Sequence, residues 1–266
     1  MSALTEAILH ADIQKLNQDY GHWDSTSIAG GVVAALNHKT VSDKLGVDKL
    51  IFASSFGLED VALQHILMPW MAHIDVVVLD TGRLPEATFD VMERWRAQFG
   101  LKIRVERPVR QDVASWVEAH GVDAFYDSVE RRLECCQLRK ILPLERALAG
   151  KRAWFTGLRR GQSMARQEVQ VFDLDPAGRL KVSPLAHWSL QDTWYYVKKH
   201  RLPYNRLHDE GFPSIGCEPC TRAVLPGEDI RAGRWWWEQE SKKECGLHGS
   251  SRLTAKHWEA KDAHKS

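Results

Sequence analysis

The sequence lacks any long hydrophobic run. It contains no segment of roughly 20 consecutive apolar residues, the length that a membrane-spanning helix needs. The N-terminal stretch 1–6 also lacks the basic residues and the apolar core of a secretion signal. We therefore expect a cytoplasmic protein with no membrane segment.

An excess of charge of either sign is also missing. The 36 Lys and Arg residues are matched by 35 Asp and Glu residues, so the net charge is +1. Binding to nucleic acid or to a membrane surface usually depends on excess positive charge, and the balance argues against both partners. With 44% hydrophobic and 27% charged residues, the 266-residue chain has the composition of a globular protein.

Cysteine is scarce, and its positions are unevenly distributed. The five cysteines form two pairs and one single residue: Cys135 with Cys136, Cys217 with Cys220, and Cys245. Thiols stay reduced in the cytoplasm, which favours metal binding or catalysis over disulfides. Four sulfurs in two pairs predict all-sulfur ligation of zinc or of an iron–sulfur cluster. The remaining thiol, Cys245, is a candidate nucleophile.

The adjacent pair favours a cluster over a single zinc ion. Neighbouring residues on a helix diverge by about 100°. Cys135 and Cys136 can therefore reach one centre only if that centre is wide or the helix is distorted there. A four-iron cluster is wider than a zinc ion, and the chain lacks the second CxxC of a zinc ribbon.

Short apolar runs alternate with helical patterns along the chain. We expect buried strands at 49–54, 74–79, 101–105 and 152–156, and helices at 61–71, 85–99, 111–119 and 124–149. Two helical stretches precede them within residues 1–45, and the segments 169–173 and 180–183 bracket a hairpin turn. Ser189 is predicted to cap a further helix. The alternation predicts an α/β fold with a parallel sheet.

Small and polar residues follow several predicted strands. Ser54-Ser55, ahead of a helix, form either an anion site or a plain strand-to-helix turn. The segments 80–82 and 157–166 fall at the same edge of the sheet, where ligands of such folds bind. The second of these is rich in Arg and Gly, as a loop over an anionic ligand would be. Arg231 and Arg234 fit one turn, and the tryptophans 235–237 are either a stacking surface or core.

These motifs together closely resemble assimilatory adenylylsulfate (APS) reductases of the PAPS/APS reductase family. The likeness runs from about residue 48 to 249 and rests on the four paired cysteines and on a set of shorter motifs: Asp80-Thr81-Gly82-Arg83, Thr156-Gly157-Leu158-Arg159-Arg160, Arg231, Arg234 and Glu244-Cys245-Gly246-Leu247-His248. The resemblance implies an adenine-nucleotide α-hydrolase-like (PP-loop type) α/β fold. It also implies reduction of APS to sulfite and AMP, in sulfate assimilation and cysteine biosynthesis.

The resemblance further implies the site residues and the partners. One [4Fe-4S] cluster per chain is expected on Cys135, Cys136, Cys217 and Cys220. Cys245 is expected to attack the substrate sulfur and form an S-sulfocysteine, which thioredoxin (or glutaredoxin) then reduces. The residues expected at the anionic substrate are Ser54, Ser55, Lys140, Arg166, Arg231, Arg234 and His248. Lys140 follows Cys136 by one helical turn, so it is expected near both the cluster and the substrate.

We expect residues 1–240 to form a single α/β domain and residues 241–266 to form a mobile tail that carries the nucleophile. The sequence leaves the oligomeric state open, a homo-oligomer included.

Three other functions compete with APS reduction. A reductase of 3′-phosphorylated APS (PAPS) shares the fold and the terminal cysteine, but such enzymes usually lack the four paired cysteines. A PP-loop iron–sulfur tRNA-modifying enzyme would need an intact Ser-x-Gly-x-Asp-Ser loop, from which residues 54–60 depart. A zinc-stapled interaction module without catalysis leaves Cys245 unexplained.

Overall fold

The computed structural model describes residues 2–10, 12–37, 50–163 and 166–238 of the chain. Its α-helices are α1 (Ala3–Leu9), α2 (Ile13–Tyr20), α3 (Ser25–Leu36), α5 (Leu58–Leu67), α6 (Glu86–Phe99), α7 (Arg110–His120), α8 (Val129–Cys136), α9 (Leu142–Leu148) and α10 (Leu190–Lys199). Its strands are β1 (Leu50–Ala53), β2 (Ile74–Leu79), β3 (Ile103–Glu106), β4 (Ala153–Phe155), β5 (Phe172–Leu174) and β6 (Leu180–Val182). None of the described helices is long and apolar enough to cross a lipid bilayer.

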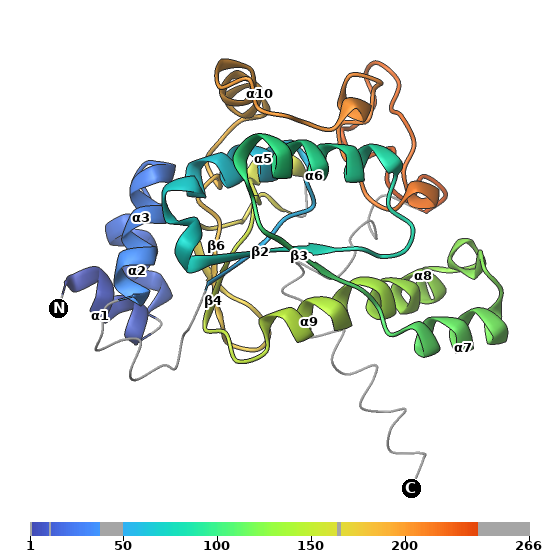
Figure 1. Cartoon of the computed structure of the whole chain (residues 1–266), viewed down its shortest axis with the longest axis horizontal. Helices are drawn as coiled ribbons and strands as arrows, with labels where there is room; N and C mark the ends of the chain where they lie inside the picture. Colours follow the sequence, from blue (N-terminus) through green and yellow to red (C-terminus); the bar gives the residue numbers. More distant parts are fainter. Residues whose placement is uncertain (1, 11, 38–49, 164–165, 239–266) are drawn as a thin grey trace, which may run out of the picture.

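The predicted α/β fold is confirmed. The described strands form one six-stranded sheet in the order β3-β2-β1-β4-β6-β5. All neighbours are parallel except the predicted hairpin, in which β5 runs antiparallel to β6. Figure 1 shows α5, α6 and α10 on one side of this sheet and α7, α8 and α9 on the other, with α1 to α3 at one end.

Successive residues of the central strands are buried on opposite faces of the sheet. Leu50 and Phe52 of β1 join the larger core, under α3, α5 and α6, whereas Ile51 between them joins a second cluster. In that second cluster Leu144 and Leu148 of α9 cover the sheet. Both faces of the sheet are thus covered, which explains why its strands read as continuous apolar runs rather than as alternating ones.

Most of the predicted elements are confirmed within a few residues, but the two helical stretches expected near the N-terminus are wrong, because the first of them is divided into α1 and α2. Helix α10 begins where expected, because Ser189 accepts a hydrogen bond from the Asp192 amide and the Asp192 carboxylate bonds back to the Ser189 amide. Helix α5 starts three residues before the prediction and ends earlier, at Leu67. A 3₁₀ turn (Met68–His73) containing Pro69 takes its place. Proline has no amide hydrogen to continue the helix.

The single helix predicted over residues 124–149 is wrong. A 3₁₀ turn (Ala124–Tyr126) precedes Ser128, which caps a new helix, α8. A π-helical turn (Gln137–Ile141) then separates α8 from α9. Pro143 has no N–H to donate to the carbonyl four residues earlier, which favours such a distortion. The distortion follows directly after the adjacent cysteines, where the sequence required either a wide centre or an irregular helix.

Candidate active site

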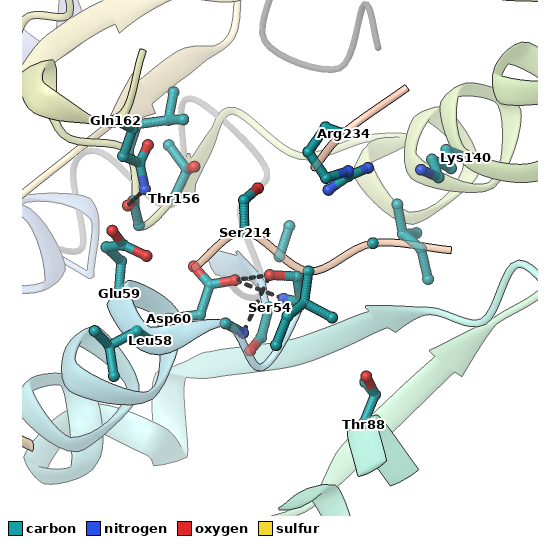
Figure 2. A pocket seen from close by; sticks show the side chains of 18 of the residues that line it. Ser54, Leu58, Glu59, Asp60, Thr88, Lys140, Thr156, Gln162, Ser214 and Arg234 are labelled. Carbon is teal, nitrogen blue, oxygen red and sulfur yellow. Dashed lines mark hydrogen bonds between the residues drawn. The ribbon is translucent and has the colours of Figure 1, made fainter. Parts of the chain in front are cut away.

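A cavity of about 210 Å³ opens at the carboxyl edge of the sheet (Figure 2). Its walls come from the segments that follow β1, β2 and β4 and from the chain around the CxxC turn. Parallel α/β sheets bind ligands at this edge, because the strand ends diverge there and leave room. Six residues predicted at the substrate line this one cavity: Ser54, Ser55, Lys140, Arg166, Arg231 and Arg234.

The loop after β1 is held by an internal carboxylate. The Ser55 amide and hydroxyl both donate to Asp60 Oδ2, each over 2.6 Å. Asp60 lies in the first turn of α5, where the helix dipole favours negative charge. Burial nevertheless raises the pKa of Asp60 to about 6. A ligand anion that used the Ser55 donors would therefore compete with Asp60, and it would do so best when Asp60 is protonated.

Gly157, in the loop after β4, packs directly on this carboxylate. A Cβ atom at position 157 would lie 2.3 Å from Asp60 Oδ1 and 3.2 Å from the Asp60 amide nitrogen, which leaves no room for a side chain. The Gly157 amide also donates a hydrogen bond to Asp60. The close approach of the two loops explains why glycine stands at the end of β4.

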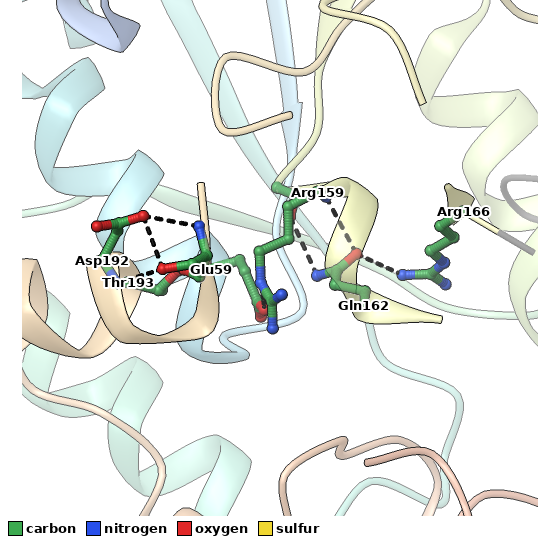
Figure 3. Close-up of polar contacts among 8 residues, drawn as sticks. Glu59, Arg159, Gln162, Arg166, Asp192 and Thr193 are labelled. Carbon is green, nitrogen blue, oxygen red and sulfur yellow. Dashed lines mark hydrogen bonds and ion pairs between the residues drawn. The ribbon is translucent and has the colours of Figure 1, made fainter. Parts of the chain in front are cut away.

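A chain of polar contacts ties Arg166 to the sheet edge (Figure 3). Arg159 is buried and pairs with Glu59, with 2.6 Å between Nε and Oε1. Gln162 Oε1 accepts hydrogen bonds from the Arg159 amide and from Arg166 Nη1, the latter over 2.7 Å. Gln162 Nε2 donates to the Gly157 carbonyl. The loop predicted to cover an anionic ligand is thus an ordered scaffold where the structure describes it.

Cationic side chains are buried on the side of the cavity next to the CxxC turn. Lys140, Arg231 and Arg234 have exposed fractions of only 8%, 9% and 6%. The Arg234 guanidinium lies 4.7 Å from the centre of the Trp235 ring, on which it stacks. Positive charge gathered at the wall of a cavity is suited to an anionic ligand.

Four thiols gather behind this wall. Cys135, Cys136, Cys217 and Cys220 line a second, smaller cavity together with Arg83, Arg132, Arg139 and Lys140. All four cysteines are buried and none forms a disulfide. The described lining of this cavity includes no carboxylate. The arrangement gives four potential thiolates and four cationic side chains around one space.

The two cavities share Lys140 and Cys217 as part of their walls. Burial acts to raise the pKa of the Cys217 thiol, but the Lys140 charge, a hydrogen bond with Thr81 and the Arg234 charge outweigh it, so its pKa is lowered. Burial raises the pKa of Cys220 to about 11. Within residues 2–238 as described, no three Cys, His, Asp or Glu side chains converge as a site for one metal ion.

The loop after β2 connects the sheet to the thiols. Thr81 Oγ1 lies 3.2 Å from Cys217 Sγ, and the Thr81 carbonyl accepts a 2.7 Å hydrogen bond from Arg139 Nη1. The Glu218 amide donates to the Arg83 carbonyl over 2.8 Å. The segment Asp80–Arg83 therefore fixes the CxxC turn and the π-helical turn relative to the sheet.

Trp235 belongs to the core, one of the two roles that the sequence left open. It is 1% exposed, and the guanidinium groups of Arg132 and Arg234 lie 4.6 and 4.7 Å from its ring centre. Phe125 and Trp237 pack beside the thiols in the same cluster. Trp236, by contrast, is 40% exposed.

Some residues that line the cavity were not predicted, and two predicted ones lie outside the described part of the chain. Cys245 and His248 fall in residues 239–266, which the structure does not describe. Gln162 and His208 line the cavity but were not predicted. Gln162 has a signal, since it lies in the Arg- and Gly-rich segment. His208 has none, because the loop that leads into the CxxC turn has no local pattern that marks it as part of the site.

The chain is similar to several known proteins. Residues 49–223 match the family described as phosphoadenosine phosphosulfate reductase domain. The adenosine 5′-phosphosulfate reductase of Allochromatium vinosum is 48% identical over 203 residues, 76% of this chain and 79% of the relative. That of Neisseria meningitidis serogroup B is 46% identical over 236 residues, 85% of this chain and 96% of the relative.

A solved structure shares the fold. The phosphoadenylyl-sulfate (PAPS) reductase of Candida auris, in a phosphate complex, aligns with a TM-score of 0.64 at 22% identity, covering 80% of this chain and 96% of that chain. By sequence match and by fold, the chain belongs to the PAPS/APS reductase family that its motifs resemble.

Proposed function

We propose that this chain reduces APS to sulfite and AMP, with thioredoxin as the electron donor, in sulfate assimilation. The observation that carries the proposal is the shared wall of the two cavities. Lys140 and Cys217 line both the larger cavity, with its buried cations, and the cavity of four thiols. Relatives that are 48% and 46% identical carry the name adenosine 5′-phosphosulfate reductase, which supports this substrate.

The buried cations are suited to the charge that develops during the reaction. When the bond between the sulfate sulfur and the phosphate oxygen breaks, negative charge accumulates on the departing AMP phosphate. Lys140, Arg231 and Arg234 are held out of water at one side of the cavity, where a fixed positive charge acts more strongly than in solvent. Arg166, held by Gln162, adds a further cation to the same cavity.

The residues around the four thiols fit a [4Fe-4S] cluster on Cys135, Cys136, Cys217 and Cys220. Iron–sulfur clusters take cysteine thiolates as ligands, and four cationic side chains here offset their negative charge. The four thiols line one small cavity, and all-sulfur ligation of this kind is typical of an iron–sulfur cluster. When bound, the cluster would supply a fixed anionic centre that ties the π-helical turn to the CxxC turn.

The chemistry itself is assigned to Cys245. Its thiolate attacks the sulfur of APS, so a sulfur–sulfur bond forms and AMP leaves with the electron pair of the broken sulfur–oxygen bond. A thioredoxin thiolate then attacks Cys245 Sγ and sulfite leaves with the bonding pair. The second thioredoxin thiol resolves the mixed disulfide, so the two thiols supply both electrons. We further propose that residues 241–266 act as a separate tail, which would let Cys245 meet its reductant.

PAPS is the alternative substrate, favoured by the name of the matching family and of the Candida auris structure. The experiment that decides is a steady-state assay of sulfite release with reduced thioredoxin and either APS or PAPS. We expect kcat/KM for APS to exceed that for PAPS by at least tenfold. Sulfite release from PAPS alone would assign the chain to the alternative, and release from neither would refute the proposed function.

A further inference from the structure

His208 lines the larger cavity and carries a hydrogen-bond acceptor that no described residue uses. It ends a 3₁₀ turn (Arg206–His208) in the loop between α10 and the CxxC turn, and it lines the cavity. Its Nδ1 lies 2.8 Å from the Phe212 carbonyl oxygen. A carbonyl can only accept, so Nδ1 carries the proton and Nε2 carries the lone pair of the neutral ring. Burial lowers the pKa of His208, which keeps the ring in this neutral form.

The Nε2 atom of His208 is buried and has no hydrogen-bond partner among the described residues. Native proteins pair nearly all of their buried polar atoms, so an unpaired atom in a cavity wall points to a missing ligand group. Arg234 Nε and Trp235 Nε1, which belong to other residues that line this cavity, are likewise buried without a hydrogen-bond partner among the described residues, but both are donors. Donors fit an anion, whereas the acceptor of His208 requires an O–H or N–H group.

The position of His208 separates it from the anion-binding wall. Glu59 is close enough for its negative charge to act on His208. Figure 2 shows Glu59 and Asp60 on one side of the cavity and Arg234 and Lys140 on the other. His208 therefore lies on the side of Glu59, away from Lys140 and Arg234, where the nucleoside half belongs if the phosphate of a bound nucleotide faces those two cations.

We propose that His208 Nε2 accepts a hydrogen bond from the nucleoside half of the bound nucleotide, either from a ribose hydroxyl or from the amino group of adenine. This assignment rests on the proposed function, since it requires that the cavity binds an adenine nucleotide. It makes His208 a residue that recognises the nucleoside, separate from the arginines and the lysine that bind its anionic end.

Two substitutions separate this role from a structural one. The amide nitrogen of asparagine occupies nearly the place of Nδ1, so His208→Asn keeps the donor to the Phe212 carbonyl and loses the acceptor. The amide of glutamine reaches the place of Nε2, so His208→Gln keeps an acceptor and loses that donor. A purely structural histidine would therefore be replaced better by Asn, and a nucleotide-binding one better by Gln.

The experiment measures AMP binding by calorimetry to the whole chain and to both variants. We expect His208→Asn to weaken AMP binding about tenfold, the effect of losing one buried hydrogen bond, and His208→Gln to stay within about threefold of the native affinity. The same titrations with 2′-deoxy-AMP, 3′-deoxy-AMP and purine riboside 5′-monophosphate identify the donor. One analogue lacks the group that donates to His208 Nε2. That analogue should bind the native chain and His208→Asn with equal affinity, because neither complex can form this hydrogen bond.

The opposite results would overturn the inference. These are native-like AMP binding by His208→Asn, weaker binding by His208→Gln than by His208→Asn, or an equal loss for AMP and all three analogues. If His208→Asn does not fold, His208→Ser takes its place in the same comparison. Failure of the native chain to bind AMP at all would instead contradict the proposed function, and the inference with it.

Discussion

At the scale of single residues, the contact between Gly157 and Asp60 decides whether the two loops of the cavity can meet. We predict that Gly157→Ala weakens AMP binding at least tenfold and lowers the free energy of unfolding by about 1–3 kcal/mol, because the new Cβ would overlap the Asp60 carboxylate. Calorimetry and chemical denaturation would measure both effects.

The control for this prediction is a variant that lacks the Asp60 carboxylate. Asp60→Ala takes away the atom with which the new Cβ collides, so adding Gly157→Ala to it should cost far less than in the native chain. Additive losses in the double variant would show that the overlap with Asp60 is not the cause.

Asp60 also predicts a dependence of stability on pH. Its pKa is about 6 in the folded protein, above the ordinary value of 3.8, so the folded state holds this proton more tightly than the unfolded state. The stabilisation of the folded state by protonated Asp60 is therefore complete below about pH 4, and it is lost as the pH rises through about 6. Relative to Asp60→Asn, the native chain should therefore lose about 1–3 kcal/mol between pH 4.5 and pH 7.5. If the free energy of unfolding changes with pH by the same amount in the native chain and in Asp60→Asn, the raised pKa of Asp60 is wrong.

At the scale of elements, a buried ion pair holds the segment of the two cavity arginines against α8. Arg132 and Glu238 are 1% and 3% exposed at their side chains, and Arg132 Nη2 donates to Glu238 Oε2 over 3.0 Å. We predict that Glu238→Ala costs about 3–5 kcal/mol of unfolding free energy, because it leaves Arg132 buried without its carboxylate.

A matched control exists nearby on the same segment. Arg222 and Glu228 form a two-pronged pair of similar geometry, but their side chains are 37% and 30% exposed. Glu228→Ala should cost less than about 1 kcal/mol, since exposed pairs contribute little. If both substitutions cost the same, the burial of Arg132 does not explain the stability of the segment.

The elements also show what sequence patterns can and cannot predict. The strands were predictable because each central one is buried on both faces and reads as a short apolar run, such as Leu50–Ala53. The division of residues 124–149 was not recognised, because a helical apolar pattern continues through it. The signals lay in single residues: the cap at Ser128 and the missing amide of Pro143.

At the scale of the whole molecule, the candidate site joins residues from segments far apart in the chain. The cationic residues of the site were predictable, because Lys140, Arg231 and Arg234 belong to recognisable motifs and do line one cavity. His208 was not, since it reaches the cavity through a loop whose path no local pattern specifies. The ion pair between Glu59 and Arg159 could not be predicted either, because only the folded chain brings these two distant residues together.

The shared wall of the two cavities predicts that the cluster and the substrate site depend on each other. We predict that Cys217→Ser lowers the iron content per chain and weakens AMP binding as well, because Cys217 lines both cavities and a hydroxyl is a poor ligand for iron. Iron analysis and calorimetry on anaerobically purified protein would test this. Full iron content would refute the ligand assignment, and unchanged AMP affinity would refute the dependence between the two sites.

The central claim is that Cys245 carries the sulfonate during turnover, and mass spectrometry of the half-reaction tests it most directly. With APS and no thioredoxin, we predict one sulfonate per chain on Cys245, release of AMP, and no sulfite until reduced thioredoxin is added. Cys245→Ser should bind AMP and keep its iron but form no adduct, because a hydroxyl is far less ionised than a thiol. Sulfite release by Cys245→Ser at the native rate, or an adduct on another cysteine, would contradict the account.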